Sequence, residues 1–152
     1  MTNNNNEETI VVASEGELLI IVSYEDAFLY ASNHDNDWIL DSGSSYHATP
    51  SRENCISYKS GNLGKVRVGN KSICDIKVVG DVIVKTKDGS SLFLKWVRHV
   101  PELGMNLIST RILDDEGYHT MFGKGTWKVI KGAFVVAKGL NLGTLYTLAI
   151  NT

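Results

Sequence analysis

The sequence is poor in cysteine, has no long apolar run and carries little net charge. Its 152 residues include only Cys55 and Cys74, too few for a disulfide framework or a four-ligand zinc site. The longest unbroken apolar run is residues 18–22, whereas a membrane span needs about 20 such residues. Met1 is followed by polar and acidic residues rather than by the basic and apolar segments of a secretory signal. These absences favour an intracellular protein that does not span a membrane.

Charge is balanced in total but unevenly distributed. Fifteen basic residues against seventeen acidic ones give a net charge of −2, which argues against a strongly basic nucleic-acid-binding surface. Residues 1–37 contain eight acidic residues and no Lys or Arg, and residues 2–8 form a polar low-complexity tract. Such a composition buries little apolar surface. We therefore interpret residues 1–37 as an acidic tail or linker, with a possible strand at residues 17–24.

From Trp38 onward, short β-branched and aliphatic segments alternate with turns that contain glycine. Residues 66–79 predict one hairpin, and residues 82–100 predict a second hairpin around Asp88-Gly89. Alternation of this kind over many short segments is typical of small all-β domains.

One helix is expected among these strands. Apolar residues at i, i+3 and i+4 spacing predict a helix of about three turns over residues 105–116, ended by Gly117. The predicted fold class is therefore all-β, a small closed or partly open barrel of residues 38–117 with one short helix. Residues 118–152 add C-terminal hairpins, and the sequence leaves open whether these pack on the barrel or begin another module. The strands expected there are residues 118–122, 126–130, 133–137 and 144–148.

The segment that carries chemistry is residues 38–49, in which an apolar strand leads into a tight Asp41-Ser42-Gly43 turn. Asp41 supplies a carboxylate, Ser42 supplies a hydroxyl, and Gly43 has no Cβ, so that other groups can approach its backbone. The same triplet also occurs as an ordinary Asx-type turn that closes a strand. Other segments of the sequence are needed to distinguish a catalytic site from an ordinary turn.

Taken together, several segments make the sequence similar to the retropepsin-like aspartic proteases, and most of all to the protease region of copia-type LTR retrotransposon Gag-Pol polyproteins. The resemblance extends from about residue 38 to residue 148. One departure is Ser44, where the family more often has Ala, and this small change preserves the turn. The matching segments are residues 38–50, 66–70, 97–101, 107–109 and 143–146.

The resemblance implies an aspartic endopeptidase that cleaves the Gag-Pol polyprotein. In such a site two aspartates share one proton and activate a water molecule, because two neighbouring carboxylates cannot both be ionised. The sequence contains a single Asp-Ser-Gly triplet, so Asp41 would meet Asp41 of a second copy in a homodimer. The resemblance implies no cofactor, no metal, no membrane partner and a cytoplasmic location in the virus-like particle of the retroelement.

Other residues have supporting roles by the same resemblance. Ser42 would hydrogen-bond across the dimer axis, and Gly43 completes the catalytic loop. The tip of the first hairpin would be the flap that closes over the substrate, and the segment before the helix would pack behind the loop. The flap residues are Gly69, Asn70, Lys71 and Ser72, and the supporting residues are Gly104, Asn106 and Leu107.

Two other functions are considered beside the protease. The first is a non-catalytic β-barrel domain of a retrotransposon Pol polyprotein, decayed or domesticated, that serves as a folding or interaction module. The second is a barrel that binds single-stranded nucleic acid, which would need tryptophans beside a basic groove. We instead assign Trp38, Trp96 and Trp127 to the core and expect no direct nucleic-acid partner. A metal site is disfavoured because the four histidines are scattered without ligand spacing.

Overall fold

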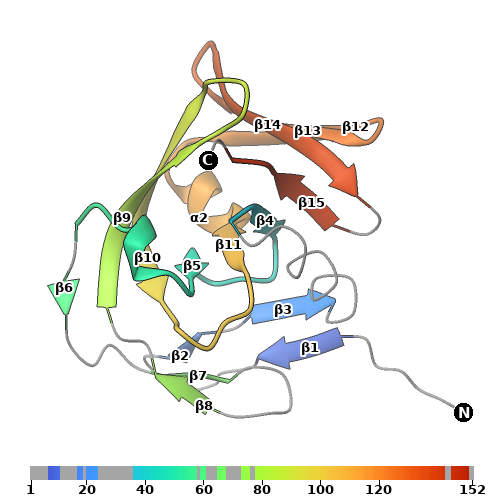
Figure 1. Cartoon of the computed structure of the whole chain (residues 1–152). Helices are drawn as coiled ribbons and strands as arrows, with labels where there is room; N and C mark the ends of the chain where they lie inside the picture. Colours follow the sequence, from blue (N-terminus) through green and yellow to red (C-terminus); the bar gives the residue numbers. More distant parts are fainter. Residues whose placement is uncertain are drawn as a thin grey trace, which may run out of the picture.

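The computed structural model describes residues 7–10, 17–18, 20–23, 36–57, 59–60, 65–67, 73–75, 78–142 and 145–150. These residues form an all-β fold, a partly open barrel with one short α-helix, as the sequence predicts (Figure 1). No helix among them is long and apolar enough to cross a membrane. The strands are β1 (Glu7–Ile10), β2 (Glu17–Leu18), β3 (Ile20–Ser23), β4 (Trp38–Asp41), β5 (Ala48–Thr49), β6 (Lys59–Ser60), β7 (Lys65–Arg67), β8 (Ile73–Asp75), β9 (Val78–Lys85), β10 (Ser91–His99), β11 (Asn106–Ser109), β12 (His119–Gly123), β13 (Thr126–Lys131), β14 (Phe134–Leu142) and β15 (Leu145–Leu148).

Ten of the strands form one mixed sheet in the order β12-β13-β14-β15-β4-β11-β5-β10-β9-β6. Strand β4 lies inside this sheet, antiparallel to β15 on one side and parallel to β11 on the other. Strand β11 also pairs antiparallel with β5, which runs parallel to β10. Because β4 is hydrogen-bonded on both sides, the position at which it ends is fixed by the sheet.

The core lies on the inner face of this curved sheet. Three consecutive residues of β4, Trp38 to Leu40, are buried, which is the pattern of an internal strand covered on both faces. Strands β9 and β10 instead alternate buried and exposed residues, because they have one face in solvent. The buried core residues are Trp38, Leu40, Val82, Val84, Leu92, Leu94, Val97, Ile108, Leu113, Trp127, Val129, Ala137 and Leu148.

The paired strands of both predicted hairpins are present. Strands β7 and β8 are antiparallel, with Lys65 opposite Asp75 and Arg67 opposite Ile73. Strands β9 and β10 are antiparallel and meet at the turn that contains Gly89, whose φ of 89° lies in the left-handed region that glycine tolerates. The tip of the first hairpin, residues 69–72, lies outside the described residues, and so do the expected flap residues. A separate pair of strands, β1 and β3, is also antiparallel.

The helix is shorter than the sequence predicts. Residues 106–109 form strand β11 and only Thr110–Asp115 form a helix, labelled α2, so the expected helix over residues 105–116 is wrong in its first half. The apolar residues of β11 are buried on both faces, and a fully buried strand gives a continuous apolar run that periodicity cannot distinguish from a helix. The predicted stop is confirmed, since Gly117 follows the helix with a φ of 89°.

Trp96 is not a core residue, contrary to expectation, whereas Trp38 and Trp127 are buried. The side chain of Trp96 is 60% exposed. The pairing of β9 with β10 shifts between Leu94 and Val97, and Trp96 lies in this bulge with a φ of 59°. A bulge breaks the alternation of side chains between the two faces of a strand, and here it turns the indole outward.

The strands expected at the C-terminus are present and belong to the same sheet as β4. Strand β15 pairs with β4 so that Tyr146 lies opposite Leu40. The indole N–H of Trp127 donates a hydrogen bond to the Thr147 carbonyl oxygen at 3.0 Å. A Cβ on Gly139 would lie 2.5 Å from that indole nitrogen, so this packing requires glycine. Residues 118–148 therefore pack on the barrel through the strand that ends at Asp41.

Candidate active site at the end of strand β4

Strand β4 ends at Asp41, where the chain turns sharply through Ser42 and Gly43. The Gly43 N–H donates a hydrogen bond to Asp41 Oδ1 at 2.8 Å, and the Ser44 N–H donates to the Asp41 carbonyl oxygen at 3.4 Å. Aspartate suits this position because its short carboxylate accepts a hydrogen bond from the backbone two residues further on. Asp41 is half-buried and Ser42 is exposed. The turn thereby holds the Asp41 carboxyl in one orientation.

The two oxygens of the Asp41 carboxyl have different surroundings. Oδ1 accepts the hydrogen bond from Gly43, whereas Oδ2 is buried and has no hydrogen-bond partner among the described residues. Burial raises the pKa of Asp41 to about 6, and the hydrogen bond from Gly43 opposes this increase. A carboxyl with such a pKa exchanges its proton near neutral pH, as a general acid or base must do.

Strand β11 supports the turn from behind. Its last residue, Ser109, lies opposite Asp41 in the parallel register. The Ser109 hydroxyl donates a hydrogen bond to the Ser44 carbonyl oxygen at 2.8 Å and accepts one from the Ile112 N–H at 3.2 Å. The second bond makes Ser109 the N-cap of α2. One buried hydroxyl therefore connects the turn to the beginning of the helix.

His47 closes the other side of the loop. The side chain is 1% exposed, and its Nδ1 accepts a hydrogen bond from the Ser109 N–H at 2.9 Å. An acceptor at Nδ1 places the ring proton on Nε2, which has no partner among the described residues. Burial, assisted by the charges of Arg111 and Arg98, lowers the pKa of His47 to about 3. The ring is therefore neutral at physiological pH, and it supports the loop rather than carrying protons.

Two arginines contact the loop from outside, one at its backbone and one at the ring of Tyr46. The Arg111 guanidinium donates a hydrogen bond to the Ser45 carbonyl oxygen at 2.7 Å and forms an ion pair with Asp115 at 2.6 Å. The Arg98 guanidinium lies 4.0 Å from the centre of the Tyr46 ring, a cation–π contact. Both contacts attach residues 45 and 46 to neighbouring elements, and neither guanidinium bonds the Asp41 carboxyl.

Of the three supporting residues predicted from the sequence, Asn106 and Leu107 are buried and Gly104 is exposed. Asn106 Oδ1 accepts a hydrogen bond from the Thr49 hydroxyl at 2.6 Å, and its amide donates to the Asp37 carbonyl oxygen at 3.1 Å. Leu107 is fully buried and lies opposite Ile39 of β4. Gly104 is exposed, and a Cβ there would meet no atom within 4 Å.

The residues that hold the turn most directly are not among those predicted from the sequence. These are Ser109 and His47, together with Arg111. Ser109 precedes a short helix, and a serine at that place is a known N-cap signal, so it was available from the sequence once the helix start was placed correctly. Nothing in the sequence indicates that the His47 ring accepts a hydrogen bond from a residue 62 positions away.

Other described aspartates near this region face elsewhere. Asp37 lies at the opposite end of β4, and its Oδ1 accepts a hydrogen bond from the Ile150 N–H at 3.2 Å. Asp114 and Asp115 are exposed on α2. The described residues also contain no group of three or more His, Cys, Asp or Glu side chains that could hold a metal ion. Within the described part of the chain, Asp41 is therefore the single carboxyl at this turn.

A small hollow of about 270 Å³ adjoins the turn. Leu40 and Ser42 line it from the β4 side, and Thr110, Phe122 and Tyr146 line it from α2, β12 and β15. The rings of Phe122 and Tyr146 are tilted against each other, with centres 4.6 Å apart. Residues of the C-terminal strands therefore lie beside the candidate catalytic loop.

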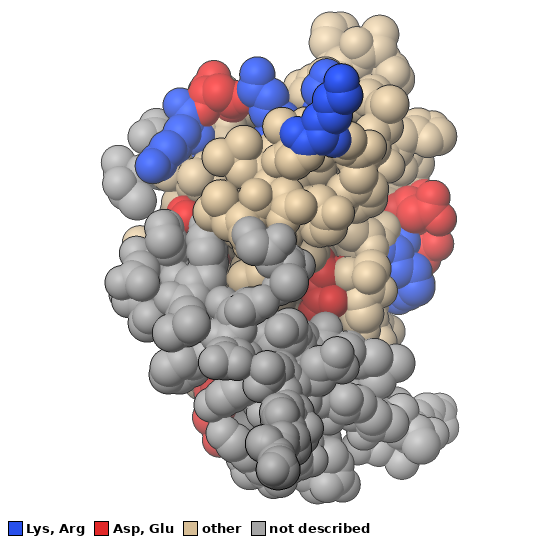
Figure 2. All heavy atoms as spheres, turned by 90° about the vertical axis from the view of Figure 1, so that its right-hand side faces the viewer, with Lys and Arg blue, Asp and Glu red and all other residues tan. Residues whose placement is uncertain are grey.

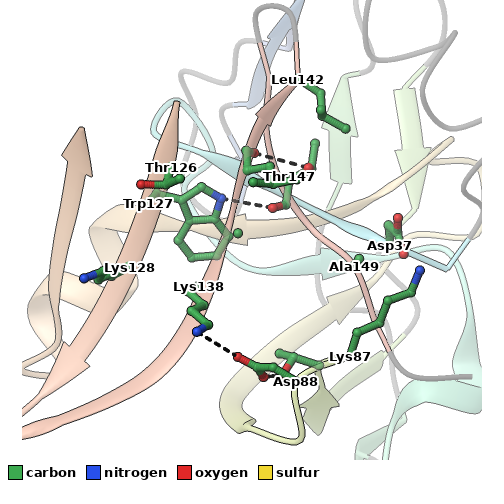
Figure 3. A pocket seen from close by; sticks show the side chains of 13 residues that line it. Asp37, Lys87, Asp88, Thr126, Trp127, Lys128, Lys138, Leu142, Thr147 and Ala149 are labelled. Carbon is green, nitrogen blue, oxygen red and sulfur yellow. Dashed lines mark hydrogen bonds and ion pairs between the residues drawn. The ribbon is translucent and has the colours of Figure 1, made fainter. Parts of the chain in front are cut away.

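A larger pocket of about 460 Å³ lies at the other end of β4, around Asp37 (Figure 3). Its lining includes Trp127 and Lys138, and the Lys138 ammonium lies 3.9 Å from the Asp88 carboxylate. None of the turn residues Asp41, Ser42 and Gly43 lines this pocket. The more spacious concavity is thus separate from the carboxyl with the raised pKa.

Comparison with known proteins identifies the family. Residues 38–118 match the family described as Pol polyprotein, beta-barrel domain, and the chain belongs to this family. The chain is 38% identical, over 143 residues, to the retrovirus-related Pol polyprotein from transposon TNT 1-94 of Nicotiana tabacum. That alignment covers 94% of this chain and 11% of the tobacco protein, so the chain spans a small part of its relative's length. No solved structure matches the chain.

Proposed function

We propose that this domain is an aspartic endopeptidase whose site is assembled from the Asp41 side chains of two copies. The observation that carries the proposal is the state of the Asp41 carboxyl at the end of β4. One oxygen is held by the Gly43 N–H, the other is buried without a partner, and the pKa is raised to about 6. A group held in this way is suited to share or transfer a proton.

The chemistry requires a second carboxyl at short distance. When two carboxyls face each other, repulsion between the charged forms keeps one protonated while the other is ionised. The ionised carboxylate removes a proton from a bound water molecule, which attacks the peptide carbonyl carbon. The protonated carboxyl donates its proton to the carbonyl oxygen, and the tetrahedral intermediate then breaks as the amide nitrogen is protonated.

Two copies are proposed because the described residues of one chain supply a single carboxyl of this kind, and the sequence has one Asp-Ser-Gly triplet. Asp37 is at the far end of the same strand, and the aspartates of α2 are exposed. A two-fold axis beside Ser42 would bring two identical turns together, since symmetry pairs a residue near the axis with its own copy. The substrate we propose is a polypeptide, specifically the Gag-Pol polyprotein, with residues 69–72 as the flap that covers it.

The test is to mix wild-type protein with the Asp41→Asn variant at a constant total concentration and to let the subunits exchange. A denatured polypeptide mixture serves as the substrate, and new N-termini are identified by mass spectrometry. With equal amounts of the two proteins, about one quarter of the wild-type activity remains if two copies share one site, because only that fraction of the dimers is intact. About one half remains if each chain has its own site.

The matched control is Asp114→Asn, which makes the same chemical change on an exposed carboxylate of α2. Mixtures with this variant should keep full activity at every ratio. Hydrolysis that persists in pure Asp41→Asn protein would overturn the proposal, whatever the oligomeric state.

One observation favours a second candidate, a non-catalytic barrel module of the polyprotein. Asp41 Oδ2 is already enclosed within a single chain, so a partner carboxyl reaches it only if the contacts over this oxygen rearrange. In the non-catalytic module, Asp41 titrates in one step near pH 6, with no partner carboxyl. In the peptidase, the paired carboxyls titrate in two coupled steps. Carboxyl-carbon NMR of Asp41 across the pH range separates the two functions without an activity assay.

A further inference from the structure

Strands β9 and β10 pair with each other and turn one face outward (Figure 1). On this face Phe93 lies opposite Ile83, and both side chains are exposed. Lys85 and Lys95 occupy alternate positions of the same face and are exposed as well. The Lys95 ammonium lies 5.9 Å from the centre of the Phe93 ring. The outward face therefore combines an aromatic ring with cations, whereas an ordinary solvent face of a sheet is polar.

The bulge in β10 adds a second exposed ring. The φ of 59° at Trp96 is unfavourable for a bulky side chain, and glycine usually occupies such a position of a β-bulge. Side chains hold both backbone groups of this residue. The Trp96 N–H donates a hydrogen bond to Asp81 Oδ1 at 3.2 Å, and the Arg98 guanidinium donates one to the Trp96 carbonyl oxygen at 2.9 Å. A strained residue that its neighbours hold in place is a feature of ligand sites, and here it presents an indole to solvent.

The row of rings and cations continues to the end of β10. Val97 is buried, so the residues on either side of it, Trp96 and Arg98, lie on the outer face. The Arg98 guanidinium in turn lies over the Tyr46 ring. Within β9 and β10 the single acidic residue is Asp81, whose carboxylate accepts the bond from the bulge. The rings of the row are Phe93, Trp96 and Tyr46, and its cations are Lys85, Lys95 and Arg98.

This composition is suited to an anionic partner with flat groups. Cations exceed acids along the row, which favours a partner that carries negative charge. They are not spread evenly over the described surface, because the face turned to the viewer in Figure 2 has a broad area without charged side chains. Exposed aromatic rings beside cations bind single-stranded nucleic acid, since every base has a face that stacks and every linkage carries a phosphate. An acidic peptide would pair with the cations but would leave the rings without a stacking partner.

We propose that the outer face of β9 and β10 binds single-stranded nucleic acid, with bases stacked on Trp96 and Phe93 and phosphates beside Lys85 and Lys95. The expectation that the chain has no nucleic-acid partner rested in part on placing Trp96 in the core. Its exposure removes that argument. The inference goes beyond the proposed peptidase and does not rest on it.

The experiment is a titration of a labelled oligothymidylate of about eight nucleotides, a length within the site sizes of single barrels, at low salt. Fluorescence anisotropy gives the affinity. Trp96→Gly should bind at least about fivefold more weakly, because one stacked base is lost. Glycine suits the φ of 59°, so the variant should be at least as stable in urea as the wild type. Phe134→Ala is the matched control, because Phe134 is 74% exposed on β14, away from the row, and should bind like the wild type.

Tryptophan emission reports the place of binding directly. Trp38 and Trp127 are buried, so a base that stacks on an indole quenches the emission of Trp96. The oligonucleotide should therefore quench the wild type, and the quenching should be absent in Trp96→Gly.

Salt dependence tests the cations without any risk to the fold. Each neutralised phosphate contributes about 0.7 to the slope of log affinity against log salt concentration for a single strand. Lys95→Gln, at an exposed position, should lower the slope by about that amount. Lys128→Gln makes the same change at an exposed position of β13 and should leave the slope unchanged.

Several outcomes would overturn the proposal. These are the absence of binding at low salt, Trp96→Gly that binds like the wild type, and a slope that Lys95→Gln does not change. Polyglutamate that displaces the oligonucleotide at equal charge concentration would show an acidic-peptide surface instead. Duplex DNA that binds as tightly as the single strand would exclude stacking on the rings. All measurements are made without a peptide substrate, so their outcome is independent of whether the domain hydrolyses peptides.

Discussion

An aspartate stands at each end of β4, and the two carboxyl groups differ in their hydrogen bonding. At the beginning, the Asp37 carboxylate accepts a hydrogen bond from the Ile150 N–H and borders the large pocket. At the end, the Asp41 carboxyl keeps one oxygen buried and unpartnered. The two aspartates are separated by one short strand, and the sequence around each is polar on one side and apolar on the other. Their chemistry is therefore set by the enclosing elements, not by residue type.

The surroundings of Asp41 show which of its groups the fold holds in place. Around Asp41, hydrogen bonds from Ser109 and Arg111 fix a loop backbone, while none of the residues that the structure describes bonds Oδ2. A carboxyl that served only to close a turn would be most stable with both oxygens solvated or bonded. An unpartnered oxygen inside a well-held loop is the arrangement expected of a functional group.

The largest effect should appear when activity is compared between the two ends. If the proposed function holds, Asp41→Asn should reduce peptide hydrolysis at least about 100-fold, because the proposed pair would lose the carboxylate that removes the proton from water. Asp37→Asn should leave hydrolysis within about threefold of the wild type, since Asp37 is at the far end of the strand and only the acid–base group is expected to matter. Rates of new N-terminus formation at equal dimer concentration give the comparison. Equal losses for both variants would contradict it.

The next effect concerns the support behind the turn. Ser109→Ala should lower the free energy of unfolding by about 3 kcal/mol, because it removes the N-cap of α2 and leaves the Ser44 carbonyl without its donor. Urea denaturation measures the change. Ser91→Ala, at an exposed position of β10, is the matched control and should stay within about 0.5 kcal/mol of the wild type. A loss as small as that for Ser109→Ala would show that the buried hydroxyl does not hold the turn.

A third effect depends on pH. The pKa of Asp41 is about 6 in the folded protein and 3.8 as its ordinary value, so the folded state binds more protons than the unfolded state between these values. Stability contributed by Asp41 is therefore full below about pH 4 and is lost as the pH rises through 6. Asp41→Asn, which stays neutral, should be about 3 kcal/mol more stable than wild type at pH 7.5. The difference should vanish near pH 4 in urea denaturation, and a difference that is constant with pH would contradict the raised pKa.

The contribution of His47 to stability has the opposite pH dependence. The effect of Asp41 is therefore seen in the difference between the variant and the wild type, in which the His47 contribution cancels. Its pKa is lowered from 6.5 to about 3, so its contribution is full above about 6.5 and is lost as the pH falls. In the wild type the two trends oppose each other between about pH 4 and 6. In Asp41→Asn only the His47 trend remains, and stability should fall with acid by about 1.4 kcal/mol per pH unit in this range.

Much of this could be predicted from the sequence, and the failures have physical reasons. Asp88-Gly89 and Gly117 identified a hairpin and a helix end, because their backbone conformations have strong local preferences. Residues 106–109 were expected to be helical, because a strand buried on both faces lacks alternation. The bond from Ser109 to His47 joins residues far apart in the sequence, and local patterns carry no information on such contacts.

The smallest effect returns to the beginning of β4 and tests whether Asp37 is merely structural. Asp37→Asn keeps an oxygen that can accept from the Ile150 N–H, so the free energy of unfolding should change by no more than about 0.5 kcal/mol. Asp37→Ala removes the acceptor and should cost about 1 kcal/mol, because the N–H at this partly buried position loses its partner. If Asp37→Ala were as stable as Asp37→Asn, the bond from the Ile150 N–H would contribute nothing to stability, and the contrast between the bonded carboxylate at the beginning of β4 and the Asp41 carboxyl at its end would be lost.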